Sequence, residues 1–101
     1  MKYNFQSINF SADGRLIDLI KKRTNKLSLF FNKIISVQVY AKLKNRTTSS
    51  NKEVELIINI PGEQFIVKKS SYSFESSINT VSSIIERLLK KYKEKLRLKS
   101  A

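Results

Sequence analysis

The stretch ISVQVYAKLK at residues 35–44 decides how this chain folds, because apolar and polar side chains alternate along its whole length. Alternate side chains of a β-strand point to opposite faces of the sheet, so the pattern predicts a strand with one buried and one wet face. The apolar positions expected inside are Ile35, Val37, Val39, Ala41 and Leu43.

A second alternating stretch, EVELIINI at residues 53–60, follows after a short interval. Its buried face should hold Val54, Leu56, Ile58 and Ile60. The residues Pro61-Gly62-Glu63 predict a turn, because proline presets φ and glycine accepts a positive φ. A further strand is expected from Gln64 to Ser71, so the three strands form an antiparallel meander.

The chain before this meander predicts a strand and then a helix. Apolar residues between Lys2 and Phe10 indicate the strand, whose alternation slips near Ser7, which indicates either a bulge or an early end. Ser11 or Asp13 can cap the helix, which should run to about Phe30. At about 100° per residue, this helix has one apolar face, formed by Leu16, Ile20, Leu27 and Phe31 with Ile17 and Thr24 beside it.

A long amphipathic helix is expected at the C-terminal end. Ser73 is a suitable N-cap, and Glu75 lies in the first turn, where the helix dipole favours an anion. The helix should persist to roughly Leu98 and, at ~38 Å, overhang strands of ~30 Å. Its apolar arc consists of Phe74, Ile78, Val81, Ile85, Leu88, Tyr92 and Leu96.

The predicted element order is therefore β-α-β-β-β-α. Both helices should cover the same face of a four-stranded sheet, because the outer face of the meander is polar. The fold class is α+β, a two-layer sandwich similar in arrangement to double-stranded-RNA-binding domains. A length of 101 residues fits one domain over residues 1–101. The polar residues 45–51 form the one loop expected to be mobile.

The composition argues against several classes of function. The chain has 20 Lys and Arg against 8 Asp and Glu, a formal net charge of +12, and neither Cys nor His. Thiolate and imidazole chemistry are therefore excluded, and the two glycines form no phosphate-binding loop. We expect no enzyme activity, no cofactor and no metal site. The close carboxylates Glu53 and Glu55 should instead form cross-strand ion pairs with Lys42 and Lys44.

Neither a signal peptide nor a membrane span is expected. The first residues alternate in polarity, with no apolar core of a signal sequence. No apolar run approaches the roughly 18 residues that a spanning helix needs. A membrane-surface role is also disfavoured, because the apolar face of the last helix is needed to cover the sheet.

The basic residues concentrate on the two helices. Arg15, Lys22 and Lys26 align on the first helix away from its apolar face. Opposite the apolar arc of the second helix lie Arg87, Lys90 and Lys91. Adjacent helices would then present a cationic strip, which suits the phosphates of a nucleic acid. The helices and the exit of the first hold thirteen of the twenty basic residues: Arg15, Lys21, Lys22, Arg23, Lys26, Lys33, Arg87, Lys90, Lys91, Lys93, Lys95, Arg97 and Lys99.

Three aromatic side chains near this strip, Phe30, Phe31 and Tyr92, have the ring faces needed to stack bases. Their helical phase places them in the core or at its edge. The residues leave two other functions open: a general double-stranded RNA- or DNA-binding module, and a protein-interaction module whose charge keeps it in solution.

Several short motifs in this order resemble one family. They are KL at residues 26–27 followed by FF at 30–31, NIPG at 59–62, SFESSI at 73–78 and, most specifically, IERLLKKYKEK at 85–95. The chain is similar over nearly its whole length to the short ribosome hibernation-promoting factors, which are related to the ribosome-associated inhibitor A proteins.

This resemblance implies a cytoplasmic protein that binds rRNA of the small ribosomal subunit in the channel for mRNA and tRNA. Translation would be inhibited by steric occlusion during stress or stationary phase, by a protein that is monomeric when free. Residues 1–101 hold no counterpart of the C-terminal domain of long members, so pairing of ribosomes by that route is not expected. Matching positions implicate Arg23, Lys26, Arg87, Lys91, Lys93 and Lys95 in RNA binding, and the helical wheel adds Lys22 and Lys90.

Overall fold

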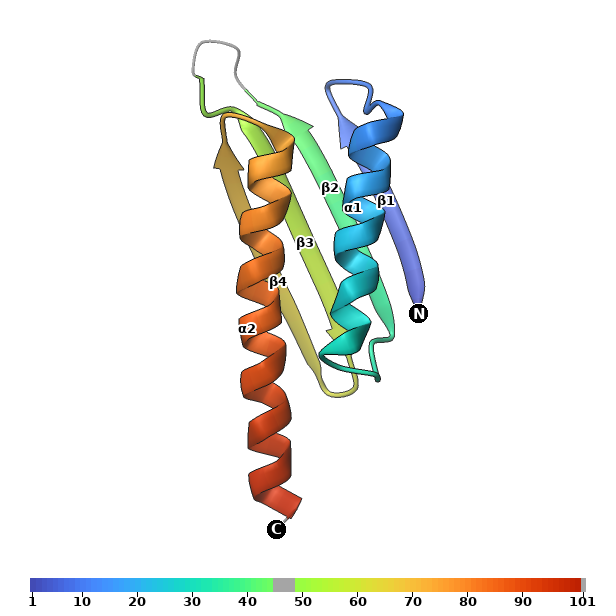
Figure 1. Cartoon of the computed structure of the whole chain (residues 1–101), viewed down its shortest axis with the longest axis vertical. Coiled ribbons are helices and arrows are strands. Elements are labelled where there is room, and N and C mark those ends of the chain that lie inside the picture. The colour runs from blue at the N-terminus through green and yellow to red at the C-terminus, as the bar shows by residue number, and fades with distance from the viewer. Residues whose placement is uncertain (45–48, 101) are drawn as a thin grey trace.

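In the computed structural model, which describes residues 1–44 and 49–100, two helices cover one face of a four-stranded sheet (Figure 1). The predicted β-α-β-β-β-α sandwich is therefore confirmed. The loop expected at 45–51 falls largely outside the described residues. The elements are β1 (Lys2–Ile8), α1 (Gly14–Lys26), a 3₁₀ turn η1 (Leu27–Leu29), β2 (Ser36–Leu43), β3 (Lys52–Ile60), β4 (Glu63–Ser71) and α2 (Phe74–Ser100).

The sheet has its strands in the order of the sequence. β1 pairs parallel to β2, with α1 as the crossover, and β2, β3 and β4 form the expected antiparallel meander. Val39 lies opposite Leu56, so the apolar sides of both strands meet on the helix-covered face. Gly62 turns the chain between β3 and β4 with φ 78°, a left-handed conformation that glycine adopts without a Cβ clash.

The core confirms most of the predicted interior and corrects it at two places. Ile35, expected inside, is 54% exposed, and Ile34 is buried instead. β2 begins only at Ser36, so the alternation does not extend back to Ile35. On α2, Leu89 is fully buried while Leu88 is only half-buried. α2 packs against α1 as well as the sheet, so its buried face widens on the α1 side.

The first strand ends early, as the slip near Ser7 allowed, and the first helix ends earlier than predicted. β1 stops at Ile8, and Asn9 adopts φ 67°, a left-handed conformation that Asn tolerates better than most residues. Asp13 is the N-cap of α1, and its side chain accepts a hydrogen bond from the Leu16 amide at 2.8 Å. α1 ends at Lys26 rather than near Phe30, because the chain tightens into the η1 turn.

The final helix begins and extends as expected. The Ser73 hydroxyl accepts a hydrogen bond from the Ser76 amide at 3.1 Å, which confirms the N-cap. The 27 residues of α2 span ~40 Å, and the C-terminal turns project beyond the sheet (Figure 1). Leu96, near the C-terminal end of α2, is exposed although it belongs to the predicted apolar arc. The projecting end carries part of the basic sequence into solvent.

The Tyr3 hydroxyl on β1 gives a prediction about stability. It is buried with no hydrogen-bond partner among the described residues, and burial raises the pKa of Tyr3 above its ordinary value of 10.0. An unsatisfied buried hydroxyl costs about 1–3 kcal/mol, so Tyr3→Phe should stabilise the fold by about 1 kcal/mol at neutral pH.

The advantage of Tyr3→Phe should grow above pH 10. The unfolded chain releases the phenol proton at its ordinary pKa, while the folded chain holds it longer, so stability falls as pH rises through that range. Urea unfolding of both proteins at pH 7 and above pH 10 measures the difference. A less stable Tyr3→Phe at both pH values would contradict the unsatisfied hydroxyl.

Candidate nucleic-acid interface

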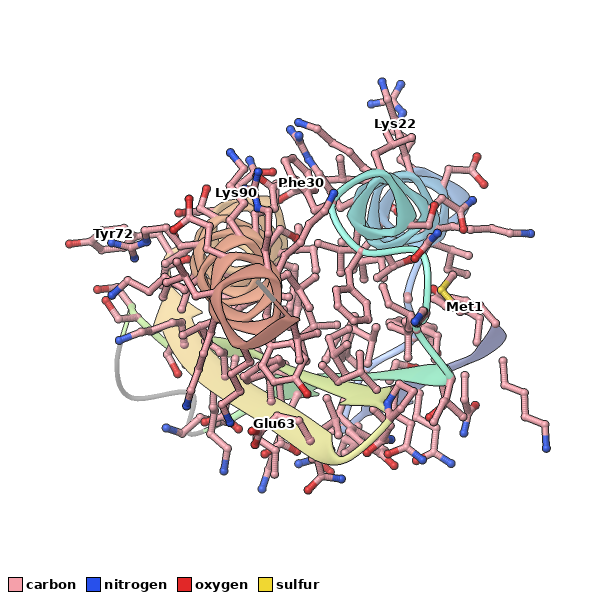
Figure 2. The ribbon with its side chains drawn as sticks, turned by 90° about the horizontal axis from the view of Figure 1, so that it is seen from below. Met1, Lys22, Phe30, Glu63, Tyr72 and Lys90 are labelled. Carbon is pink, nitrogen blue, oxygen red and sulfur yellow. The ribbon has the colours of Figure 1, made fainter. Side chains whose placement is uncertain are left out.

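The outward faces of α1 and α2 lie side by side on the layer away from the open sheet face (Figure 1). Figure 2 looks along the helices and places Lys22 far from the sheet, whereas Glu63 lies on the sheet side. An ion pair of 3.9 Å joins Lys26 Nζ on α1 to Glu86 Oε1 on α2. The adjacent basic helices that the sequence predicted are therefore present.

α1 presents its three predicted site residues in different ways. Lys22 and Lys26 are exposed, and Arg23 is half-buried at the edge of the core. The Arg23 Nε is buried with no acceptor among the described residues. Next to it, the buried Thr24 hydroxyl donates to the Ile20 carbonyl of the same helix at 3.0 Å, and the buried side chains of Leu16, Ile20 and Thr24 form the core-facing side of α1. This arrangement holds the Lys22 and Lys26 ammonium groups toward solvent.

The predicted residues of α2 divide into two rows. An inner row, which we define as Lys90, Lys93 and Arg97, lines a pocket together with Phe30 from the end of α1. Lys90 Nζ lies 4.8 Å from the centroid of the Phe30 ring, a cation–π contact between α2 and the residue that follows the η1 turn. Lys90 and Lys93 are therefore brought together with the end of α1.

The outer row is defined by the i, i+4 spacing of Arg87, Lys91 and Lys95, all of them exposed. Successive members of such a row are offset by about 40° around a helix, so the row turns away from α1 along the chain. Arg97, which the sequence reasoning left out of the site, belongs to the pocket. Its i, i+4 spacing from Lys93 is the signal that places it there.

The aromatic residues confirm the prediction that they belong to the core or its edge. Phe31 is buried, and its ring centroid lies 5.8 Å from that of Tyr92. The Tyr92 hydroxyl donates to the Pro61 carbonyl at 3.4 Å. Phe30 is half-buried beside the inner row (Figure 2).

The open sheet face differs in charge from the helices. The predicted pair between Glu53 and Lys44 is present at 3.3 Å. Glu55 also forms a cross-strand ion pair, but with Lys68 on β4 at 3.7 Å rather than with one of the two expected lysines, Lys42 and Lys44. Both glutamates on this face are therefore paired with lysines of a neighbouring strand or its end.

The described residues contain neither a cluster of metal-ligating side chains nor a helix suited to crossing a membrane. No group of three or more acidic or other metal-ligating side chains could hold a metal ion within residues 1–44 and 49–100. Over the same part of the chain, no helix has the length and apolar character that crossing a membrane requires.

The fold and the basic helix surface define a small two-layer α+β protein of a type already seen in ribosome-associated proteins. A ribosomal subunit interface protein from Coxiella burnetii has the same fold, with a TM-score of 0.75 and 16% identity, covering 90% of this chain and 98% of the other. The Protein Y N-terminal domain from Thermus thermophilus is similar, with a TM-score of 0.73 and 15% identity over 90% of this chain and 94% of that domain.

The chain belongs to the family described as sigma 54 modulation protein / S30EA ribosomal protein, whose model matches residues 3–97. A ribosome hibernation promoting factor from Pseudomonas putida is 25% identical over 95 residues, which cover 94% of this chain and 89% of the relative. The family expected from the sequence motifs is therefore confirmed.

Proposed function

We propose that this protein is a ribosome hibernation factor that binds rRNA of the small ribosomal subunit in the channel for mRNA and tRNA. It blocks translation by occupying that channel and acts in the cytoplasm, where its target lies. Family membership and the relative named a ribosome hibernation promoting factor support the hibernation role. In this proposal, residues 1–101 act as one ribosome-binding domain.

The observation that carries the proposal is the basic surface formed jointly by α1 and α2. Lys26 on α1, with Lys90 and Lys93 on α2, flanks the line where the two helices meet. Lys22 on α1 points away from the sheet (Figure 2). Such a basic surface binds phosphates without recognising bases. The affinity for rRNA then comes from charge, and the selectivity comes from the shape of the ribosomal channel. The mechanism is steric occlusion: the folded protein binds rRNA through its helices and excludes mRNA and tRNA from the channel.

Co-sedimentation with purified ribosomal subunits tests this function. We expect the protein to pellet with the small subunit, and to pellet less when mRNA and tRNA already occupy the channel. Binding only to the large subunit, or binding that tRNA and mRNA leave unchanged, would contradict the proposed position. Equal competition by free duplex RNA would instead favour a general duplex-binding module.

A further inference from the structure

A pocket of about 250 Å³ lies where the end of α1 meets α2. Its lining residues are Leu29, Phe30, Lys90, Lys93, Glu94 and Arg97. Leu29 is 79% exposed, an unusual position for a large apolar side chain at the rim of a basic surface. Phosphate binding uses the cations of this pocket, but it uses neither the apolar wall nor the carboxylate.

The apolar wall suits the flat face of a nucleobase. Phe30 is half-buried, and in the free protein its ring is covered by the Lys90 ammonium at 4.8 Å from the ring centroid. A cation–π contact at a solvent-exposed site is weaker than the stacking of a base on an aromatic ring. An incoming base can therefore replace the ammonium, which is then released to pair with a phosphate.

The carboxylate of Glu94 adds a preference among bases. An ionised carboxylate only accepts hydrogen bonds, and it repels phosphate, so a site for phosphate alone gains nothing from it. Carboxylates recognise cytosine through its exocyclic amine, whereas uracil presents a carbonyl oxygen at the same position. Glu94 lines the pocket beside Phe30 and therefore favours a base that carries an exocyclic amine.

We propose that this pocket binds one unstacked nucleotide of an RNA strand, with its base against Phe30 and Leu29 and its exocyclic amine on Glu94. Lys90 and Lys93 take the neighbouring phosphates. The site rests on the proposed function, because it assumes that RNA runs along α1 and α2. The rest of the basic surface recognises only charge and shape. The pocket would add one point at which a base is recognised.

Equilibrium binding of oligocytidine and oligouridine RNA of equal length tests this site. Both bases stack as single pyrimidine rings, so the comparison reports on the hydrogen-bonding edge, where cytosine presents an exocyclic amine beside the acceptor N3 and uracil presents a carbonyl oxygen beside N3–H. We expect oligocytidine to bind roughly tenfold more tightly, the size of one good base contact. Phe30→Leu should weaken both RNAs by roughly tenfold, because it keeps an apolar side chain but removes the stacking face.

Glu94→Gln should abolish the preference for oligocytidine, because the amide both donates and accepts hydrogen bonds. Two matched controls should leave affinity and preference unchanged: Tyr72→Leu removes an exposed aromatic ring outside the pocket, and Glu75→Gln neutralises a carboxylate in the first turn of α2. Because Glu94 is exposed, Glu94→Gln tests the site even where Phe30→Leu unfolds the protein.

Equal binding of the two RNAs, unchanged by Glu94→Gln, would overturn the nucleotide pocket. The proposed function would still stand in that case if the protein pelleted with small subunits, so the two failures are distinguishable. Free cytidine monophosphate competing as well as oligocytidine at equal nucleotide concentration would also overturn the assignment to an RNA strand.

Discussion

Reversing three charges on the outward helix face, with K22E, R87E and K90E combined, should lower the affinity for ribosomes by roughly 1000-fold or more. All three side chains are exposed on α1 or α2. A hydrogen bond to a charged group contributes about 1.5–3 kcal/mol. Three lost contacts therefore remove at least about 4 kcal/mol, which corresponds to about three orders of magnitude, and the new carboxylates repel phosphate in addition.

A charge-matched variant on the open sheet face controls for net charge. K2E, K42E and K68E combined also lower the formal net charge from +12 to +6, because each change removes two positive units. We expect this variant to keep its affinity to within about tenfold, since exposed charges act beyond ~10 Å only weakly at physiological salt. Co-sedimentation measures both variants, and circular dichroism verifies that each remains folded.

The comparison between the two variants decides between a defined interface and bulk charge. Equal losses in both variants would show that only net charge matters. Full binding by the helix variant would remove α1 and α2 from the interface. Binding that survives nuclease treatment in the native protein would point to a protein partner.

The architecture was predictable from side-chain periodicity, because a sheet with one solvent-exposed face and one buried face requires polar and apolar residues to alternate along its strands. The side chains of Val37, Val39, Val54, Leu56 and Ile58 are all fully buried, and the residues that alternate with them are polar except for Ile57. Most of the errors lie at element ends, where a period no longer applies, whereas the burial of Leu89 in place of Leu88 follows from the packing of α2 against α1. Ile35 precedes β2, and the end of α1 tightens into the η1 turn.

The sequence predicted which basic residues face away from the core, but not which of them lie close together in the fold. The helical wheel separates basic from apolar faces on each helix, yet it contains no information on how two helices rotate relative to each other. The Lys26–Glu86 ion pair and the Lys90–Phe30 contact join residues 60 positions apart in the sequence. These contacts separate the inner row from the outer row, which in sequence form one continuous basic run.

The salt dependence of RNA binding should be steep. Each phosphate contact releases condensed counterions, so log K falls linearly with log salt by about 0.7 per contact for single strands and 0.9 for duplexes. If each of the eight predicted site residues contacts one phosphate, the slope is about −6 to −7. Affinity should then fall by roughly 10³- to 10⁴-fold between 50 and 200 mM salt.

The slope of log K against log salt also tests the predicted site residues one at a time, including the inner and outer rows of α2. Lys→Gln at any true contact should reduce the magnitude of the slope by about one unit. If RNA follows the line between α1 and α2 alone, Lys90→Gln reduces the slope while Lys91→Gln and Lys95→Gln leave it unchanged. If the outer row also binds RNA, all three variants reduce it equally. Lys68→Gln, on the open sheet face and paired with Glu55, is the control that should leave the slope unchanged. A slope near zero in the native protein would exclude phosphate neutralisation as the source of affinity, because counterion release accompanies every such contact.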